Sequence, residues 1–446
     1  MAGEKFLVDG VSGAVFQINQ LIWDYFVLLE TEKENTAWEK LALAYSPEEA
    51  WAAKEELTYL TEQGWLFADD AETEKRAAAL SPGTLKSLCL HIAHDCNLRC
   101  RYCFASTGDY KGKRAVMSQE VALKAIDFLL AQSPEVKNYI LDFFGGEPLL
   151  NFAVVREAVL YAERKAGELG KSFKFSLTTN ATLLNEEKTA FLNEHNIEVI
   201  LSLDGDSSTH DAMRPFPDGS GSQAVVLKKA REFIASRGEN NYYIRGTFTG
   251  LNPYFMQNIT YLIAEGFKNI SLEPVVALPA EEYALSEADL PVIFQEYEKL
   301  AEFYLSQYKE NKAFHFFHYD LKLRNGPCLA RRIMGCGAGT EYLSIGPEGE
   351  IYPCHQFMGR EKYAMGNILQ GDFSRNIGEV LRKNHIYRKK CRDCWARFYC
   401  SGGCQANADL INQDIAVPYE LGCEIEKKRL ECLFYLQDKL QRSNEA

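Results

Sequence analysis

Apolar residues in the first part of the chain follow two different periods. Two short apolar runs flank a turn in FLVDGVSGAVFQI (residues 6–18), a pattern that predicts a β-hairpin. QLIWDYFVLLE and PEEAWAAKEELTYLTEQGWLFAD then show helical spacing, and the second stretch begins after Ser46 as N-cap and stops at Gly64. With a short returning strand at 65–67, these elements predict a winged-helix-like domain over residues 1–80 that ends in a charged, Ala-rich linker.

From about residue 85 the pattern alternates between strands and helices. Helical stretches such as SQEVALKAIDFLLAQ separate apolar segments that we interpret as strands: SLCLHIAH, NYILDFFGG, FKFSLTTN, EVILSLDG, YYIRGTFTG and ISLEPVVAL. This alternation predicts an α/β domain over residues 85–310, with a parallel sheet, open or closed, and helices outside it. Polar residues crowd the carboxyl ends of the strands, where α/β enzymes place their active sites.

The last part of the chain is rich in Cys and Gly and has only short predicted elements. Such a composition is expected where metal rather than a large core organises the fold. We therefore assign residues 326–425 to a Cys-rich domain, and the amphipathic stretch EIEKKRLECLFYLQDKLQ places a C-terminal helix in residues 426–446.

Composition and charge exclude several classes of protein. Apolar residues make up 46% of the chain, as in globular proteins. No run of eighteen apolar residues exists, and MAGEKFLVDG lacks a basic segment before an apolar one, so nothing argues for a membrane span or for secretion. The net charge of −13 without a basic stripe weighs against nucleic acid as the main partner. We expect a cytoplasmic protein.

The thirteen cysteines are unevenly distributed. Because no export signal is present, metal ligands or reduced thiols are favoured over disulfides. CNLRCRYCF places Cys96, Cys100 and Cys103 within eight positions, directly after the first strand of the α/β domain. Three thiolates can hold a cubane iron–sulfur cluster and leave one iron open. The alternative is a zinc knuckle that takes His91 or His94 as its fourth ligand.

This loop, followed by Gly-Gly-Glu-Pro after the second strand, resembles the radical S-adenosylmethionine (radical SAM) superfamily over roughly residues 85–425. The resemblance implies a partial (β/α)6-type barrel whose open iron chelates S-adenosylmethionine. One electron, from a reductant such as flavodoxin or ferredoxin, then yields a 5′-deoxyadenosyl radical. The implied cofactor contacts are Tyr102, Gly145, Gly146, Glu147, Asn180, Ser202, Asp204 and Arg214.

Several of these residues also have simpler interpretations. Gly-Gly-Glu-Pro by itself is a turn. Asp204 could cap the helix after its strand, and His210 with Asp211 could form a local hydrogen-bonded turn. Their order supports the resemblance, because each falls at the end of a successive predicted strand.

The C-terminal cysteines resemble the SPASM domain, which holds two auxiliary [4Fe-4S] clusters in maturases of ribosomally made peptides. The match runs from Cys336 through Gly349 and Cys354 to the CxxCx5CxxxC motif at 391–404. It implies that Cys336, Cys354 and Cys404 serve the first cluster with Cys328 as a fourth ligand, and that the second uses Cys391, Cys394, Cys400 and Cys423. If Cys328 is not a ligand, the first cluster has an open iron. A zinc ribbon is the alternative for Cys391 and Cys394.

One residue departs from the sulfatase-maturing relatives, in which an Asp base follows the cysteine that corresponds to Cys354. Here His355 stands in that position. The segment GCGAGTEYLSIGPEGEIYPCHQF is more similar to maturases that form thioether bridges, the SCIFF and ranthipeptide groups. His355 could be a base, a hydrogen-bond donor to a cluster sulfur, or a structural histidine.

We therefore expect a radical SAM enzyme with three [4Fe-4S] clusters that installs Cys-to-residue thioether crosslinks in a Cys-rich precursor peptide. Residues 1–80 resemble the peptide-recognition element of such maturases, in which the leader peptide adds a strand to an open sheet edge; a stabilising cap is the alternative. Other peptide oxidations, C–C crosslinks and a zinc-organised interaction protein remain as rival functions.

Overall fold

The computed structural model describes residues 3–79, 83–320, 329–388 and 390–445. A ten-stranded sheet follows the order β10-β9-β8-β7-β6-β5-β3-β11-β12, and β4 pairs with β3 outside that path. All neighbours from β11 to β10 are parallel. The strands are β3 (Ser87–His94), β4 (Ala115–Val116), β5 (Asn138–Gly145), β6 (Ser172–Thr179), β7 (Glu198–Ser202), β8 (Tyr242–Phe248), β9 (Asn269–Pro274), β10 (His315–Phe316), β11 (Tyr342–Ile345) and β12 (Ile351–Tyr352).

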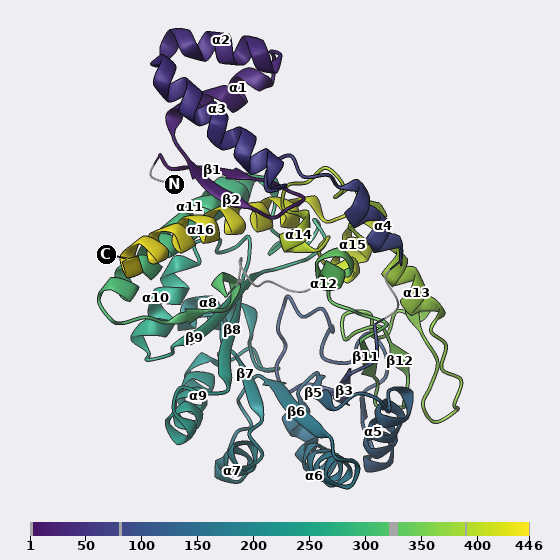
Figure 1. Ribbon diagram of the computed structural model, residues 1–446. Coiled ribbons are helices and arrows are strands. Elements are labelled where there is room, and N and C mark those ends of the chain that lie inside the picture. Colours follow the sequence, from purple (N-terminus) through teal and green to yellow (C-terminus); the bar gives the residue numbers. More distant parts are fainter. Residues whose placement is uncertain (1–2, 80–82, 321–328, 389, 446) are drawn as a thin grey trace.

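Helices cover the outer face of the strands, which fan out in Figure 1. They are α5 (Gln119–Gln132), α6 (Phe152–Leu169), α7 (Glu186–Glu194), α8 (Ser207–Met213), α9 (Gln223–Arg237), α10 (Met256–Ala264) and α11 (Leu290–Lys309). Alternate strand residues such as Tyr139, Leu141 and Phe143 are buried with these helices in the main core. Because side chains alternate along a strand, the residues between them face the inner side of the sheet. The prediction of an α/β partial barrel is confirmed.

The N-terminal region has its own small core. A hairpin of β1 (Lys5–Val8) and β2 (Val15–Ile18) precedes α1 (Gln20–Leu29), α2 (Glu34–Ala44) and α3 (Pro47–Glu62). The Ser46 side chain accepts a hydrogen bond from Glu49 N in a capping box, and Gly64 follows α3 with a φ of +67°. The expected strand at 65–67 is wrong: Trp65 N and Leu66 N both donate to Leu60 O, so the chain closes the helix.

The segment after this domain is partly helical. It forms α4 (Ala71–Ala79), where an Ala-rich linker was expected. Ala77 is buried in a cluster with Tyr387, Cys391 and Phe398 of the Cys-rich region. The segment therefore packs on the Cys-rich region rather than crossing solvent.

The Cys-rich region extends the main sheet through β11 and β12, which the sequence pattern did not indicate. Its helices are α12 (Leu329–Met334), α13 (Asn376–Lys383), α14 (Arg397–Cys400), α15 (Gln405–Asn412) and α16 (Glu420–Glu445). Figure 1 shows α16 running beneath the N-terminal hairpin. No helix in the described ranges combines the length and the apolar character that a bilayer span requires.

Candidate active site

The loop after β3 gathers Cys96, Cys100 and Cys103, all partly exposed. Two backbone hydrogen bonds fix it to the segment after α8: Arg99 N donates to Pro215 O and Arg101 N donates to Met213 O, both at 2.8 Å. Burial raises the pKa of the Cys96 thiol to about 12 and that of the Cys100 thiol to about 11, and each of the three thiols raises the pKa of a neighbour in the set. The three sulfurs therefore form one local group.

Two glycines let the end of β5 approach this loop closely. A Cβ on Gly146 would lie 2.1 Å from Asp95 O, and one on Gly145, whose φ is +125°, would lie 2.4 Å from Ala93 O. Gly146 N donates to Ala93 O at 2.7 Å and Glu147 N donates to Asp95 O at 2.8 Å. Any larger residue at Gly146 would displace the backbone that carries Cys96.

Glu147 is fully buried, and its hydrogen bonds connect the ends of β5 and β6. Its Oε1 accepts hydrogen bonds from Leu149 N and Thr179 Oγ1, and its Oε2 accepts one from Asn180 N at 2.8 Å. Burial raises the pKa of Glu147 to about 7. Asn180 in turn donates to Asn97 Oδ1 at 2.9 Å and approaches Cys96 Sγ at 3.7 Å. These two residues link the strand ends to the Cys loop.

Tyr102, Asp204 and Arg214 form a second buried network. Arg214 contacts Asp204 through two bonds of 3.0 Å, and Tyr102 Oη donates to Asp204 Oδ2 at 2.5 Å. Thr247 N donates to Asp204 Oδ1 at 2.9 Å. Burial would raise the pKa of Asp204, but the charges of Arg214 and His210 and the hydrogen bonds from Arg214 and Tyr102 together outweigh burial and hold this pKa below its usual value. Both carboxylate oxygens of Asp204 thus have protein partners that anchor the Cys loop.

The other polar residues at the strand ends have different roles. Ser202 ends β7 and pairs in register with Arg245 of β8. His210 is buried, where it approaches Asp204 N at 3.3 Å and Ser222 Oγ at 3.0 Å. Asp211 accepts a hydrogen bond from Gln223 N at 2.7 Å. His210 and Asp211 therefore make the local hydrogen-bonded arrangement that was the simpler interpretation.

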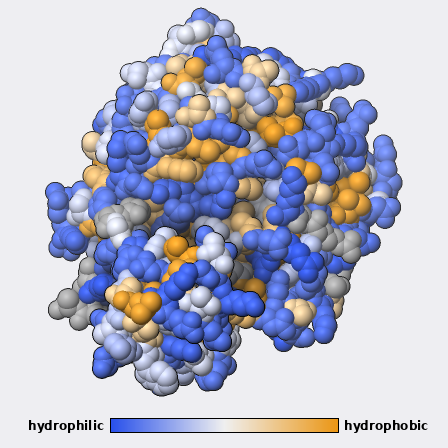
Figure 2. Space-filling model, turned by 90° about the horizontal axis from the view of Figure 1, so that it is seen from above, coloured by the Kyte–Doolittle hydropathy of each residue, from blue (hydrophilic) through white to orange (hydrophobic). Residues whose placement is uncertain are grey.

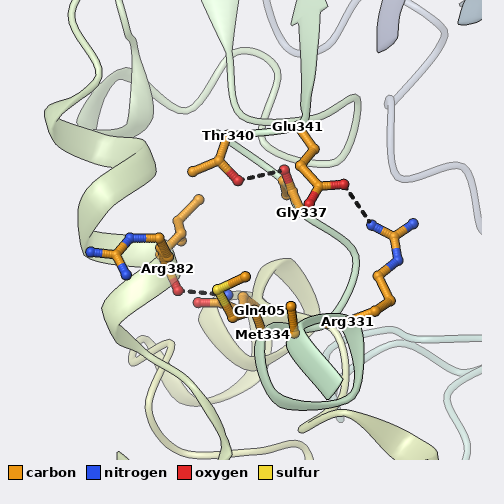
Figure 3. Close-up of a pocket in the computed structure, with 11 residues that line it drawn as sticks. Arg331, Met334, Gly337, Thr340, Glu341, Arg382 and Gln405 are labelled. Atoms are coloured by element: carbon orange, nitrogen blue, oxygen red, sulfur yellow. Dashed lines mark hydrogen bonds and ion pairs between the residues drawn. The ribbon is translucent and has the colours of Figure 1, made fainter. Parts of the chain in front are cut away.

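The first auxiliary set consists of Cys336, Cys354 and Cys404. Burial raises the pKa of the Cys354 thiol to about 12, and Cys404 and Cys336 raise it further, so the three lie near one another. Cys328 lies outside the described residues. Figure 3 shows a pocket beside this set, where Arg331 points toward Glu341 and Gln405, next to Cys404, lies opposite. Arg331 also donates to Cys336 O at 2.9 Å.

The second auxiliary set consists of Cys391, Cys394, Cys400 and Cys423. Burial, and after it the nearby Glu426, Cys423 and Cys391, raise the pKa of the Cys400 thiol to about 12. Burial, and after it the nearby Cys391 and Cys394, raise the pKa of Cys423 to about 11. Cys423 lies in the first turn of α16, so this helix brings it to a loop that precedes it by more than twenty residues.

His355 follows Cys354 and contacts residues from three neighbouring elements, which are β5, the Cys loop after β3, and β11. Its Nδ1 lies 3.3 Å from Tyr342 Oη, and its ring centroid lies 5.0 Å from that of Phe144 and 5.9 Å from that of Phe104. Burial and the charge of Arg245 lower its pKa to about 4. Phe104 belongs to the Cys loop, so His355 lies between this loop and the first auxiliary set.

The donor chemistry fits iron–sulfur clusters. All three sets offer soft sulfur donors, and no disulfide forms among the cysteines of the described ranges. No three His, Cys, Asp or Glu side chains within those ranges meet closely enough to hold a single metal ion. His91 and His94 contact each other at 3.1 Å between Nδ1 and Nε2. Buried thiols of raised pKa need a bound cation to be thiolates, which a cluster supplies.

Sequence reasoning missed the polar residues on the inner face of the sheet. Asp142 of β5 is in register with Cys89 of β3 and with Ser176 of β6. Arg245 of β8, with 55% of its side chain exposed, lies 3.6 Å from Glu273 of β9. A signal was present, because each interrupts an apolar strand at a position between two core residues.

Comparisons with known proteins agree with this geometry. Residues 90–253 match the model of the radical SAM superfamily, and residues 336–395 match that of the SPASM iron–sulfur cluster-binding domain. An uncharacterized protein of Methanocaldococcus jannaschii is 30% identical over 314 residues, which are 70% of this chain and 96% of that protein.

Two characterised relatives are similar over a comparable length. A cysteine-type anaerobic sulfatase-maturating enzyme of Clostridium novyi is 26% identical, covering 73% of this chain and 90% of the relative. The radical SAM cyclopropyl synthase TigE of Paramaledivibacter caminithermalis is also 26% identical, covering 72% of this chain and 68% of the synthase.

Two solved structures share the fold. Native anSMEcpe with bound AdoMet has a TM-score of 0.67 at 23% identity and covers 79% of this chain and 98% of its own. Streptococcus suis SuiB bound to precursor peptide SuiA has a TM-score of 0.54 at 16% identity and covers 92% of this chain and 94% of its own. This chain is a member of the radical SAM superfamily and carries a SPASM iron–sulfur cluster-binding domain.

Proposed function

We propose that this enzyme installs thioether crosslinks between Cys and a second residue in a ribosomally made, Cys-rich precursor peptide. The observation that carries the proposal is the position of His355. It follows a ligand of the first auxiliary set and contacts Phe104 of the Cys loop and Phe144 of β5. A peptide between these elements would meet both sulfur sets, as a reaction that joins a thiol to a carbon radical requires.

The proposed ligand sets follow from the sulfur groups. Cys96, Cys100 and Cys103 would hold one [4Fe-4S] cluster whose open iron would bind S-adenosylmethionine, and the C-terminal sets would hold two more, the first with Cys328 as its fourth ligand. When bound, the reduced cluster and S-adenosylmethionine supply a carbon radical that removes hydrogen from the acceptor residue. The residues that we propose to line this cofactor position are Tyr102, Gly145, Gly146, Glu147, Asn180, Ser202, Asp204 and Arg214.

The chain's own residues position and enclose the reactants. Arg214 and Asp204 hold Tyr102, and through it the Cys loop, against the strand ends. Glu147 and Asn180 fix the opposite side. The rings of Phe144 and His355 lie together next to the first auxiliary set, where we propose that His355 contacts the peptide and forms a hydrogen bond with its reacting group.

Oxidation of a peptide residue is the second candidate function. The similarity to sulfatase-maturating enzymes favours it. His355 argues against it, because the sulfatase-maturing resemblance implies an acidic residue at this position. The two candidates differ in product: a thioether consumes a peptide thiol for each bridge, whereas oxidation at a site other than Cys leaves every thiol reactive.

We further propose that residues 1–80 bind the leader of the precursor. β1 pairs only with β2, so no described residue pairs with its outer edge. A groove of about 440 Å³ runs beside it between the hairpin and α16, lined by Glu4, Lys5, Phe6, Val8, Trp23, Trp395, Glu431, Phe434 and Tyr435. An open strand edge beside an apolar groove suits an extended peptide.

Two further observations support recognition over a purely stabilising cap. Seen from above, the end of the molecule that carries the N-terminal helices has several hydrophobic patches (Figure 2), and exposed side chains there include Trp51 and Phe67. Residues 83–446 are 364 of 446, about 82% of the chain, so the alignment with SuiB, which covers 92%, includes part of residues 1–82. SuiB was solved with a precursor peptide.

The remaining partners follow from the chemistry. A flavodoxin or ferredoxin would supply the electron, and the reduced thiols suit a cytoplasmic location. To test the function, the reconstituted enzyme is incubated anaerobically with S-adenosylmethionine, a reductant and a Cys-rich precursor. For each bridge, we expect the peptide to lose two hydrogens and one alkylatable thiol. Mass spectrometry measures both losses. A modified peptide whose thiols all remain alkylatable would support the second candidate instead.

A further inference from the structure

Asp142 lies in a row of polar side chains on the inner face of the sheet. Strand register pairs it with Cys89 of β3 and Ser176 of β6, and the row continues to Ser344 of β11 and Glu198 of β7. Residues in register on neighbouring strands share one face. Since Leu141 and Phe143 on either side of Asp142 are buried against the helices, this face is the inner one.

Only one oxygen of the Asp142 carboxylate accepts a hydrogen bond from a described residue. Ser176 Oγ donates to its Oδ1 at 2.6 Å. Among the described residues, no group donates to Oδ2. The residue is half-buried rather than sealed in the core. One oxygen is therefore left for a ligand on the inner side of the barrel.

The surroundings of Asp142 bring the pKa of its carboxyl group closer to neutral pH. Burial, opposed by the Ser176 hydrogen bond and assisted by the charge of Glu198, raises the pKa of Asp142 to about 6. Cys89 and Tyr342 also face it, and burial raises the pKa of both, so they stay neutral. A carboxylate of this pKa accepts a proton near pH 7 more readily than an ordinary aspartate.

Asp142 also lies near the space where the peptide is expected. Phe144, the next inner-face residue of β5, has its ring 5.0 Å from that of His355. Tyr342, whose pKa responds to the charge of Asp142, lies 3.3 Å from His355 Nδ1. Asp142 is thus one layer deeper on the wall between the Cys loop and the first auxiliary set.

We propose that Asp142 is a catalytic residue that takes the proton of the reacting peptide thiol before the crosslink closes. This inference rests on the proposed thioether chemistry. The S–H bond breaks, both of its electrons stay on sulfur, and the proton passes to Oδ2 of Asp142. Ser176 orients the carboxylate through Oδ1.

The test compares Asp142→Asn with Asp127→Asn, an exposed aspartate of α5 that accepts a hydrogen bond from Tyr161. Crosslinking of a Cys peptide should fall about 10²- to 10³-fold in Asp142→Asn and stay unchanged in Asp127→Asn. S-adenosylmethionine cleavage and peptide affinity should persist in both. A selenocysteine peptide should restore most of the rate, because a selenol ionises at far lower pH than a thiol and needs no base.

The pH profile provides a second measurement. The wild-type rate should fall below about pH 6, the pKa of Asp142, as this carboxylate is protonated. Ser176→Ala removes the hydrogen bond that stabilises the charged form of Asp142, so the pKa of Asp142 should rise. The fall in rate should then begin at a higher pH than in the wild type. If Asp142→Asn does not fold, as judged by its melting temperature and iron content, this shift decides the question.

Three results are distinguishable. No thioether from the wild-type enzyme would contradict the proposed function itself. A wild-type thioether with an unimpaired Asp142→Asn variant would overturn only the role of Asp142. Equal losses with the Cys and selenocysteine peptides would make Asp142 a structural residue and also overturn the proposal.

Discussion

The guanidinium of Arg397 lies 2.8 Å from the carboxylate of Asp70, although 327 residues separate them in the chain. Arg397 is buried in α14 between Cys394 and Cys400, and Tyr387 Oη donates to the other oxygen of Asp70 at 2.6 Å. The segment that follows the N-terminal domain is thus tied to the loop of the second auxiliary set. Two more contacts reinforce the connection: Tyr399 Oη donates to Gly13 O at 2.5 Å, and Gly10 packs on the backbone of Trp395.

Asp70→Ala should weaken the second auxiliary site. Removing one partner leaves the buried charge of Arg397 unpaired, and because Asp70 is partly exposed we expect a loss of about 2–3 kcal/mol of stability. Anaerobic denaturant unfolding and iron analysis would measure it, with up to about four iron ions lost for each chain. Glu74→Gln, which breaks the exposed pair with Arg392, should cost under about 1 kcal/mol and serves as the control. Equal effects of the two substitutions would contradict this role of Asp70.

Iron content tests the three sulfur sets together. The anaerobically purified protein should hold about 12 iron ions for each chain if three cubane clusters form. Changing Cys96, Cys100 and Cys103 together to Ala should remove about a third of the iron and abolish S-adenosylmethionine cleavage. Stoichiometric zinc without the broad visible absorption of iron–sulfur clusters would favour the zinc-organised alternative.

Gly146→Ala should disrupt the Cys loop, since its Cβ would meet Asp95 O at 2.1 Å. Backbone atoms cannot move as a flexible side chain does, so we expect a cost of about 1–3 kcal/mol together with strongly reduced S-adenosylmethionine binding. Gly167→Ala is the matched control, because nothing lies within 4 Å of its Cβ position in α6. It should be neutral or stabilise the protein by up to about 1 kcal/mol. Calorimetric titration and thermal melts compare the two variants.

Asp204 should make the protein sensitive to acid. Its folded-state pKa is lowered, so its contribution is complete above the unfolded pKa of about 3.9 and is lost as the pH falls through the folded value. Asp204→Asn should cost about 3–5 kcal/mol at neutral pH, because Arg214 stays buried without its partner. The variant should also lose less stability than the wild type as the pH falls below about 4. Unfolding curves at several pH values measure this, and parallel curves would contradict it.

Leader recognition can be tested without deleting the domain, which would also remove Asp70. Phe6→Ala and Phe434→Ala leave the backbone edge of β1 in place but remove apolar side chains that line the groove beside it. Each substitution should weaken leader binding about 10-fold or more. A leader peptide N-methylated at alternate residues should also lose affinity, because it cannot pair with a strand edge. Fluorescence anisotropy measures both effects.

The control for the groove is the opposite edge of the hairpin. Gln17 lies on β2 and does not line the groove, although its amide donates to Glu4, so Gln17→Ala should change leader binding much less than the two Phe variants. If Gln17→Ala weakens binding while the groove variants do not, the leader pairs with β2. If none of the three variants has an effect, residues 1–80 are a stabilising cap.

The sequence alone determined the local features of this protein. The apolar segments SLCLHIAH and NYILDFFGG predicted β3 and β5 nearly to the residue, because a short apolar run between helical stretches is a local signal for a strand. Ser46 and Gly64 marked the start and end of α3, since caps depend only on neighbouring backbone groups. The three cysteines of the first loop could be identified from the sequence for the same reason, because their spacing is local.

Only the tertiary structure decided which distant groups meet. It added β11 beside β3, brought Cys423 to Cys391 through α16, and joined Arg397 to Asp70. It also determined that both carboxylate oxygens of Asp204 are occupied, whereas one oxygen of Asp142 is left open toward the inner face among the described residues. Periodicity encodes which face a side chain takes, but its partners and its pKa depend on register across strands and on burial, which exist only once the chain has folded.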